Sequence, residues 1–231
     1  LYPVNCRFVS SMEAVSMGLG DGRNAMLLLG FESEHYPQKD AMAKALDVCR
    51  EHGGRYNRRK VTHTESRVRS GAAGNWRSNF IKAPYIRDIM ARKGMVTETL
   101  ETAVTWDQFE AFHQAVIDAA QRAFDTHCRG RGMITCRFTH IYPDGPAPYY
   151  SLVAWSEPGR QLETWDAIKA TVSDAIIDHG GTITHHHAVG RDHRPWYERE
   201  RGELFTTTLK GLKSTLDPNW VLNPGVLLEE R

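Results

Sequence analysis

Two stretches of this chain repeat one order of elements, and this repetition limits the possible folds more than any other feature. Residues 24–58 and residues 149–186 each begin with a strand-like apolar segment and continue into an amphipathic helix. Both helices end on the same tripeptide, His-Gly-Gly, at residues 52–54 and 179–181. Glycine just past the last helical residue adopts the left-handed conformation that ends a helix. Because a new strand is expected to start at Thr182, we predict two related strand–helix–strand units that superpose.

A third unit of similar kind lies between these two. Residues 95–104 have a periodicity that fits either a strand or a helix, whereas residues 105–108, Thr-Trp-Asp-Gln, match the capping box that starts a helix. The apolar stripe of this helix comprises Phe109, Phe112, Val116, Ala119, Ala120 and Ala123. Residues 133–142 alternate as a strand, and the turn sequence Pro-Asp-Gly-Pro at 143–146 leads into the next strand. Two strands joined by so short a turn are expected to be antiparallel.

These segments predict an α+β fold, with a largely antiparallel sheet covered by helices and a resemblance to duplicated ferredoxin-like units. Residues 198–216 are expected to form one further helix before an apolar tail. A chain of 231 residues is long enough for one large domain or two small ones, and for a buried core. Its longest apolar run, residues 25–29, is far shorter than the roughly 20 residues of a membrane-spanning helix.

Charge and cysteine content argue against several classes of protein. The formal net charge is +1, so we expect no nucleic-acid partner, although a local basic pocket for an anion is compatible with this balance. The cysteines Cys6, Cys49, Cys128 and Cys136 lack the Cys-x-x-Cys spacing of zinc and redox sites. Scattered reduced thiols are typical of an intracellular protein, and we expect a cytoplasmic location. The chain starts with Leu1 and shows no signal peptide, and we expect it to be part of a longer protein.

Histidines are concentrated near the end of the second strand–helix–strand unit. Five of the 11 histidines lie within residues 179–193, and His185, His186 and His187, the His triplet, are consecutive. In a strand, the first and third of these would share one face and the second would point to the other. Such a pair could bind a metal ion, but no motif offers a third ligand, and we expect no metal. Because imidazole titrates near neutral pH, we interpret the triplet as a rim of proton-transferring groups.

The strands contain further candidate residues, and some motifs are absent. Arg137 interrupts a strand-like run, and a buried arginine would need an anionic partner. Tyr149 and Tyr150 open the next strand, where tyrosines usually serve packing. Neither G-x-x-x-x-G-K-[S/T] nor G-x-G-x-x-G occurs in the sequence, so it offers no phosphate cradle for a nucleotide or flavin of its own.

Several segments together resemble one known family. Residues 184–191, Thr-His-His-His-Ala-Val-Gly-Arg, with Trp196 and with residues 216–225, Leu-Asp-Pro-Asn-Trp-Val-Leu-Asn-Pro-Gly, resemble the C-terminal end of FAD-linked oxidases of the vanillyl-alcohol oxidase type. The His triplet, with Thr-Cys-Arg at 135–137 and Ala-Pro-Tyr-Ile-Arg-Asp at 83–88, resembles the alkyldihydroxyacetonephosphate synthase branch, also called alkylglycerone-phosphate synthase. The resemblance spans nearly the whole chain.

This resemblance implies that residues 1–231 form a substrate-binding cap domain above the flavin ring of FAD. The FAD would be held mainly by an N-terminal FAD-binding domain, a partner that lies outside this sequence, and a homodimer is a further expectation. Such a synthase exchanges the acyl chain of acyl-dihydroxyacetone phosphate for a fatty alcohol in ether-lipid synthesis, with no net redox change. The substrate is therefore expected to be a small lipid phosphate, and this fragment alone is expected to be inactive.

The resemblance also implies catalytic roles for individual residues. Tyr150 matches the tyrosine proposed as acid and base in that branch, and His185, His186 and His187 match a histidine-rich wall of the catalytic pocket. Arg137 matches an arginine near the flavin and the substrate. These side chains are therefore expected to face a common pocket.

Other implied roles concern the rim of the site. Arg87 and Arg191, together with Arg137, are expected to bind the anionic part of the substrate. His187 and Asn223 are expected to approach the FAD, because the C-terminal tail returns towards the flavin domain in such proteins.

Two other functions stay open at this point. The same fold could serve an FAD-linked oxidoreductase of a 2-hydroxy acid such as glycolate or D-lactate. The chain could also be a non-catalytic α+β binding module. Reduction of the flavin by a hydroxy acid would favour the first of these, and the absence of any flavin domain upstream would favour the second.

Overall fold

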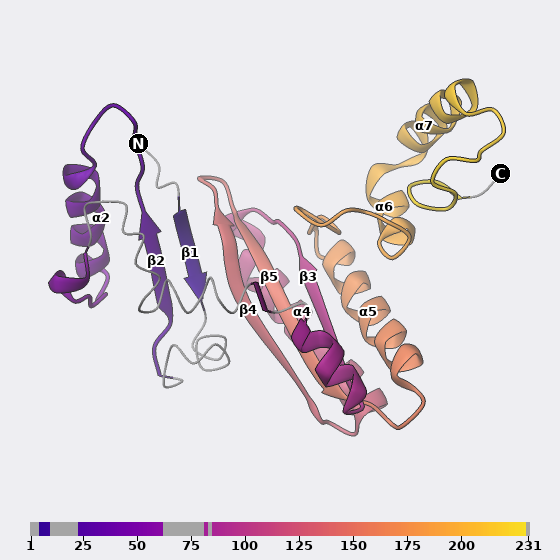
Figure 1. Cartoon of the computed structure of the whole chain (residues 1–231), viewed down its shortest axis with the longest axis horizontal. Coiled ribbons are helices and arrows are strands. Elements are labelled where there is room, and N and C mark those ends of the chain that lie inside the picture. The colour runs from indigo at the N-terminus through magenta and orange to yellow at the C-terminus, as the bar shows by residue number, and fades with distance from the viewer. Residues whose placement is uncertain (1–4, 10–22, 62–80, 83–84, 230–231) are drawn as a thin grey trace. The chain divides into compact units, whose positions relative to one another are not determined.

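The computed structural model describes residues 5–9, 23–61, 81–82 and 85–229 (Figure 1). The chain divides into two compact units, of which the first comprises residues 1–85 and 137–140 and the second residues 86–136 and 141–231. Residues 137–140 belong to a strand whose two ends lie in the second unit.

The first unit is built on an antiparallel ladder of two strands, with which residues 137 and 138 also pair. Strand β1, Asn5–Val9, pairs with β2, Met26–Gly30, which confirms the strand predicted in this region. Helix α2, Lys39–Glu51, follows, and Gly53, with a φ of 80°, lies just past its end as predicted. The described residues after it form a short 3₁₀ helix, η1, at Arg58–Lys60, where the sequence analysis expected a second strand.

The second unit contains an antiparallel sheet in the order β4-β5-β3 (Figure 1). Strand β3 spans Met95–Glu101, β4 spans Gly132–Ile141 and β5 spans Pro146–Trp155. The amide of Tyr142 donates to the carbonyl of Gly145 at 2.9 Å and closes the hairpin between β4 and β5. A Cβ at Gly145 would lie 2.0 Å from a backbone oxygen, so the turn requires glycine. The predicted hairpin is therefore confirmed.

Helices α4, Trp106–Cys128, and α5, Gln161–Asp178, pack on each other and on the strands β5 and β3. The helix predicted from the capping box starts at Trp106 as expected, although the Thr105 side chain makes no capping hydrogen bond. Each large side chain that is fully buried between sheet and helices stabilises the fold by about 1.5–3 kcal/mol. Such side chains include Leu100, Phe112, Phe124, Tyr150, Val172 and Ile176.

Two sequence predictions on the second unit are wrong. Residues 182–187 form an irregular segment and not a strand, because side-chain carboxylates bind several of its polar groups. The single helix predicted for residues 198–216 is two helices, α6, Arg194–Arg201, and α7, Glu203–Leu216. Gly202 separates them with a φ of 75° and a ψ of 169°, a conformation that L-residues rarely adopt.

The α+β class with its antiparallel sheet is confirmed, whereas the duplicated ferredoxin-like arrangement is not. In the described residues, neither repeat closes with the second strand that the duplication needs. Within the same residues, no helix combines the length and the apolar character that crossing a membrane requires.

Candidate active site

The His triplet lies on a segment that carboxylates from two elements hold in place. We name this segment, residues 182–193, the triplet loop. At its start, the hydroxyl of Thr182 and the amide of Ile183 donate to the Glu200 carboxylate of α6 at 2.8 Å and 2.9 Å. In its middle, the amide of His186 donates to Glu101 Oε2 at 2.6 Å. Backbone amides must find acceptors when a segment is packed against the protein, and here side chains take the place of a strand ladder.

Glu101, at the end of β3, is the residue around which the triplet gathers. Its side chain is 1% exposed, and Oε1 lies 3.4 Å from Nδ1 of His185 and 3.1 Å from Nδ1 of His186. The two imidazole rings lie 4.3 Å apart, so they do not point to opposite faces as a strand would require. Sequence reasoning missed Glu101, although an acidic residue next to a buried strand position was a usable signal.

A carboxylate, an imidazole and a phenol hydroxyl form one hydrogen-bonded series at this place. Because a carboxylate can only accept, the contact with Glu101 favours a proton on Nδ1 of His185, and in that tautomer Nε2 can accept from a hydroxyl. The hydroxyl of Tyr142 lies 3.1 Å from that Nε2, in a T-shaped ring contact at 5.6 Å between centroids. This order, in which a carboxylate orients a base and the base faces a hydroxyl, suits proton transfer.

The two tyrosines of β5 lie on opposite faces of the strand. The ring of Tyr149 meets the ring of His187 edge-on at 5.5 Å between centroids. Tyr150 is 0% exposed, and its hydroxyl lies 3.0 Å from Nδ1 of His113 on α4. Burial raises the pKa of Tyr150 well above its usual value and lowers the pKa of His113, so the hydroxyl donates to a neutral imidazole.

The fold therefore brings Tyr149, and not Tyr150, to the side of the triplet. The acid–base role assigned to Tyr150 stays a prediction. A signal for the correct face was present in the alternation of β5, because Ser151 and Val153 share the half-buried side with Tyr149, whereas Leu152 is buried with Tyr150.

The predicted arginines occupy three separate settings. Arg137 lies on β4, half-buried, with its Cα opposite Val9 of β1 in the first unit. Arg87 is exposed on a helical stretch, and residues 83–84 of its sequence motif lie outside the described residues. The guanidinium of Arg191 donates from Nε and Nη2 to the carbonyl of Pro224 at 3.3 Å and 2.7 Å.

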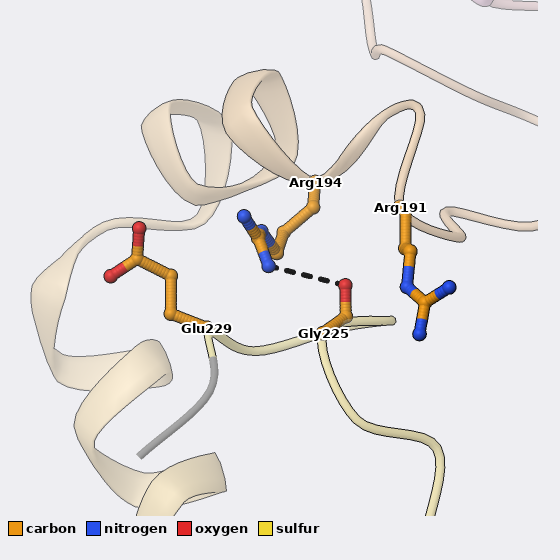
Figure 2. A pocket seen from close by; sticks show the side chains of 4 residues that line it. All are labelled: Arg191, Arg194, Gly225 and Glu229. Carbon is orange, nitrogen blue, oxygen red and sulfur yellow. Dashed lines mark hydrogen bonds between the residues drawn. The ribbon is translucent and has the colours of Figure 1, made fainter.

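Arg191 forms part of a pocket between the triplet loop and the C-terminal tail. Arg194, Gly225 and Glu229 line the same pocket (Figure 2). Figure 2 shows the guanidinium of Arg194 bonded to the carbonyl of Gly225, at 3.1 Å. Asn223 precedes this anchored turn with a φ of 47° and is exposed. Both arginines therefore fasten the tail, which keeps Asn223 on the surface of the unit.

The donor set of the triplet also bears on metal and cofactor binding. Ligand atoms of Glu101, His185 and His186 lie within 4.8 Å of one another and could hold a metal ion, and the expectation that none is used stays untested. For FAD, the predicted contacts are His187, which is half-buried, and Asn223, which is exposed, so both can offer polar atoms to the rim of a flavin. These residues fit the edge of a flavin site but not a phosphate cradle.

The family described as "FAD linked oxidases, C-terminal domain" matches residues 4–227. The chain belongs to this family, as the sequence resemblance predicted.

Similarity to individual proteins points in the same direction. Alkyldihydroxyacetonephosphate synthase of Dictyostelium discoideum is 26% identical over 162 residues, which cover 69% of this chain and 26% of that protein. A solved structure of alkyldihydroxyacetonephosphate synthase superposes with a TM-score of 0.65 at 18% identity, over 96% of this chain and 39% of the other. A shorter match, 34% identical over 65 residues, covers 28% of this chain and 14% of the glycolate oxidase subunit GlcD of Bacillus subtilis. The chain thus spans about a quarter of the synthase.

Proposed function

We propose that this chain is the substrate domain of an FAD-dependent enzyme that exchanges the acyl chain of acyl-dihydroxyacetone phosphate for a fatty alcohol. The observation that carries the proposal is the gathering of the His triplet around buried Glu101, with tyrosine rings against its first and last members. Membership of the FAD-linked oxidase family and the similarity to alkyldihydroxyacetonephosphate synthase support it.

The exchange places a defined demand on proton-transferring groups. The bond between the dihydroxyacetone carbon and the acyl oxygen breaks, and the fatty acid leaves with that oxygen as a carboxylate. The oxygen of the alcohol forms the new ether bond, and its proton has to be accepted by the protein or by water. Imidazoles beside a carboxylate can accept and return that proton near neutral pH.

We assign the acid–base role to the tyrosine beside the triplet, Tyr149, in place of Tyr150. Its ring already contacts His187, so a proton could pass between the hydroxyl of a reacting alcohol and the imidazole wall. Arg137, Arg87 and Arg191 are proposed to attract the phosphate, because guanidinium groups pair well with phosphate oxygens.

FAD, when bound, supplies the group that traps the substrate during the exchange, without net redox change. An N-terminal FAD-binding domain is proposed to hold most of the cofactor. Within this chain, His187 and Asn223 would contribute to the rim of the flavin site. The homodimer, the absence of a nucleic-acid partner and the cytoplasmic location stay predictions.

The test uses the natural protein that carries this chain, purified with its flavin. We expect it to convert acyl-dihydroxyacetone phosphate and a labelled fatty alcohol into the alkyl ether and one equivalent of fatty acid. Glu101→Gln keeps the acceptor for the loop amide but removes the charge, and should lower turnover. Arg122→Gln, on the exposed side of α4, is the matched control and should leave it unchanged.

A second candidate function is favoured by the match to a glycolate oxidase subunit. In that case anaerobic addition of glycolate or D-lactate would bleach the oxidised flavin, and the alkyl exchange would be absent. Turnover of neither substrate class would favour a non-catalytic binding module.

A further inference from the structure

A row of buried polar side chains links the sheet to the far end of the triplet loop. Lys169 on α5 is 5% exposed, and its Nζ lies 3.3 Å from Oε1 of Glu98 on β3. The same Nζ lies 3.2 Å from Nε2 of His193, which is 7% exposed and precedes α6. The other ring nitrogen of His193, Nδ1, lies 3.0 Å from the carbonyl of Ala188.

These contacts define the protonation state of His193. An ammonium group can only donate, so Nε2 must accept from Lys169. A carbonyl can only accept, so Nδ1 must carry the proton and donate it to Ala188. His193 is therefore neutral and holds the Nδ1–H tautomer. Its backbone amide also donates to the carbonyl of Val189 at 3.1 Å. His193 therefore binds two consecutive residues directly after the triplet, Ala188 through its side chain and Val189 through its main chain.

We propose that Glu98, Lys169 and His193 are positioning residues, which lock the tautomer of His193 and thereby fix the triplet loop. The proposal rests on the proposed function only where it concerns what the triplet loop does in catalysis. The fixed tautomer of His193 and the fixed position of the loop are properties of this chain. The loop is then held at its start by Glu200 of α6 and at its end by the side chain of His193, which directly precedes α6.

The electrostatic surroundings support a neutral imidazole. Burial, and after it the positive charge of Lys169, lower the pKa of His193. The charged groups that act on it are Lys169 from α5 and, with the opposite sign, Glu98 from β3. Glu98 balances the ammonium of Lys169 and also accepts from the indole of Trp165, so the lysine charge is paired although it is buried. Protonation of His193 would place a second positive charge against Lys169 and break the bond that Nε2 accepts.

Two amide substitutions separate the halves of this arrangement. The side-chain amide of His193→Asn takes the approximate place of Nδ1–H and can still donate to Ala188. The longer side chain of His193→Gln reaches the place of Nε2, where it can accept from Lys169 but no longer bind Ala188. A role in packing alone would make the smaller Asn the more damaging of the two.

The experiment measures hydrogen exchange of the amides at residues 183–192 in the natural protein, with the amides of the β3–β5 ladder as the control for global unfolding. We expect His193→Gln to raise exchange in the loop at least about tenfold, the loss of roughly one hydrogen bond to a buried group, and His193→Asn to stay close to the wild type. Equal exchange in the two variants, or greater exchange in His193→Asn, would overturn the proposal.

The pH dependence gives a readout that packing would not change. Below about pH 6.5, His193 binds a proton in the opened loop but stays neutral in the closed loop. The equilibrium constant for loop opening in the wild type should therefore rise by up to about tenfold for each pH unit by which the pH falls. His193→Asn should lack this increment, while the contributions of all other groups are common to both proteins and cancel in the comparison. The same pH profile in both would contradict the proposal.

Two further measurements complete the test. Nitrogen NMR of the wild type at pH 7 should find His193 neutral with the proton on Nδ1, and an Nε2–H or doubly protonated ring would overturn the proposal even if every variant unfolds. With alkyl exchange as the assay, His193→Gln should lower kcat more than it changes KM. His193→Asn should keep a kcat close to that of the wild type. If the wild type lacks this activity, the proposed function fails. The hydrogen exchange of the loop and the tautomer of His193 still test the positioning role in that case.

Discussion

Replacing the neighbouring tyrosines of β5 by phenylalanine, one at a time, tests how the sheet divides its faces between core and site. Tyr150→Phe removes a hydroxyl that contacts Nδ1 of His113 at 3.0 Å in a fully buried position. Leaving a buried acceptor unpaired costs about 1–3 kcal/mol. In a chain of this length, each kcal/mol lowers the melting temperature by about 2–4 °C, so we expect a loss of about 2–12 °C. Turnover per folded molecule should change little.

The same substitution at Tyr149 should have the reverse profile. Tyr149 is half-buried, and phenylalanine preserves the edge-on ring contact with His187. Because this side chain is only half-buried, the loss of stability should be smaller than in Tyr150→Phe. If the hydroxyl transfers a proton in the reaction, its removal should lower kcat by about 10²–10⁴-fold.

The assay pairs thermal unfolding with alkyl-exchange turnover in the natural protein. One result would refute this reasoning: a Tyr150→Phe enzyme that is inactive but as stable as the wild type, next to an active Tyr149→Phe enzyme. The acid–base assignment made from the sequence would then stand, and Tyr149 would be a packing residue.

Three further predictions address the cofactor, the buried charges and acid stability. The purified 231-residue chain should be colourless, and a stoichiometric flavin absorbance would contradict the view that another domain holds most of the FAD. Lys169→Met leaves the carboxylate of Glu98 without its ammonium partner and should cost about 3–5 kcal/mol in urea unfolding, and adding Glu98→Gln should recover part of this loss. Burial lowers the pKa of both His113 and His193, so the unfolded chain binds their protons first as the pH falls. Below about pH 6.5 the free energy of unfolding should fall by up to about 2.7 kcal/mol per pH unit from these two groups, and His193→Asn should remove about half of this slope.

Much of the fold could be predicted because its signals are local. The apolar stripe of α4, the glycine stops of α2 and α5 and the Pro-Asp-Gly-Pro turn each depend on residues a few positions apart. The strand expected at residues 182–187 failed for the opposite reason. Its β-branched residues fit a strand, but its polar groups are bound by Glu101, more than 80 positions earlier, and by Glu200 on the following helix. No local pattern contains that information.

The candidate site could be predicted only in part. The His triplet stood out by composition, and a family resemblance supplied its role, but neither identified the carboxylate at its centre. Glu101 and Glu98 lie three residues apart on β3 and therefore on opposite faces, and each serves a different buried network. Which face meets the helices is decided by tertiary packing, so a sequence alone could not assign the two glutamates or the two tyrosines.

The register of β3 against β5 connects core and site in one choice. Leu100 lies opposite Tyr150, and both are 0% exposed against the helices. Glu101 lies opposite Tyr149, and these two flank the His triplet on the other face. A slip of one residue would reverse every side chain of the strand, placing Leu100 on the site face and Glu101 in the core. Because burying Leu100 is worth about 1.5–3 kcal/mol, and an unpaired buried carboxylate would add to the cost of the slip, the apolar core itself fixes which residues meet the triplet.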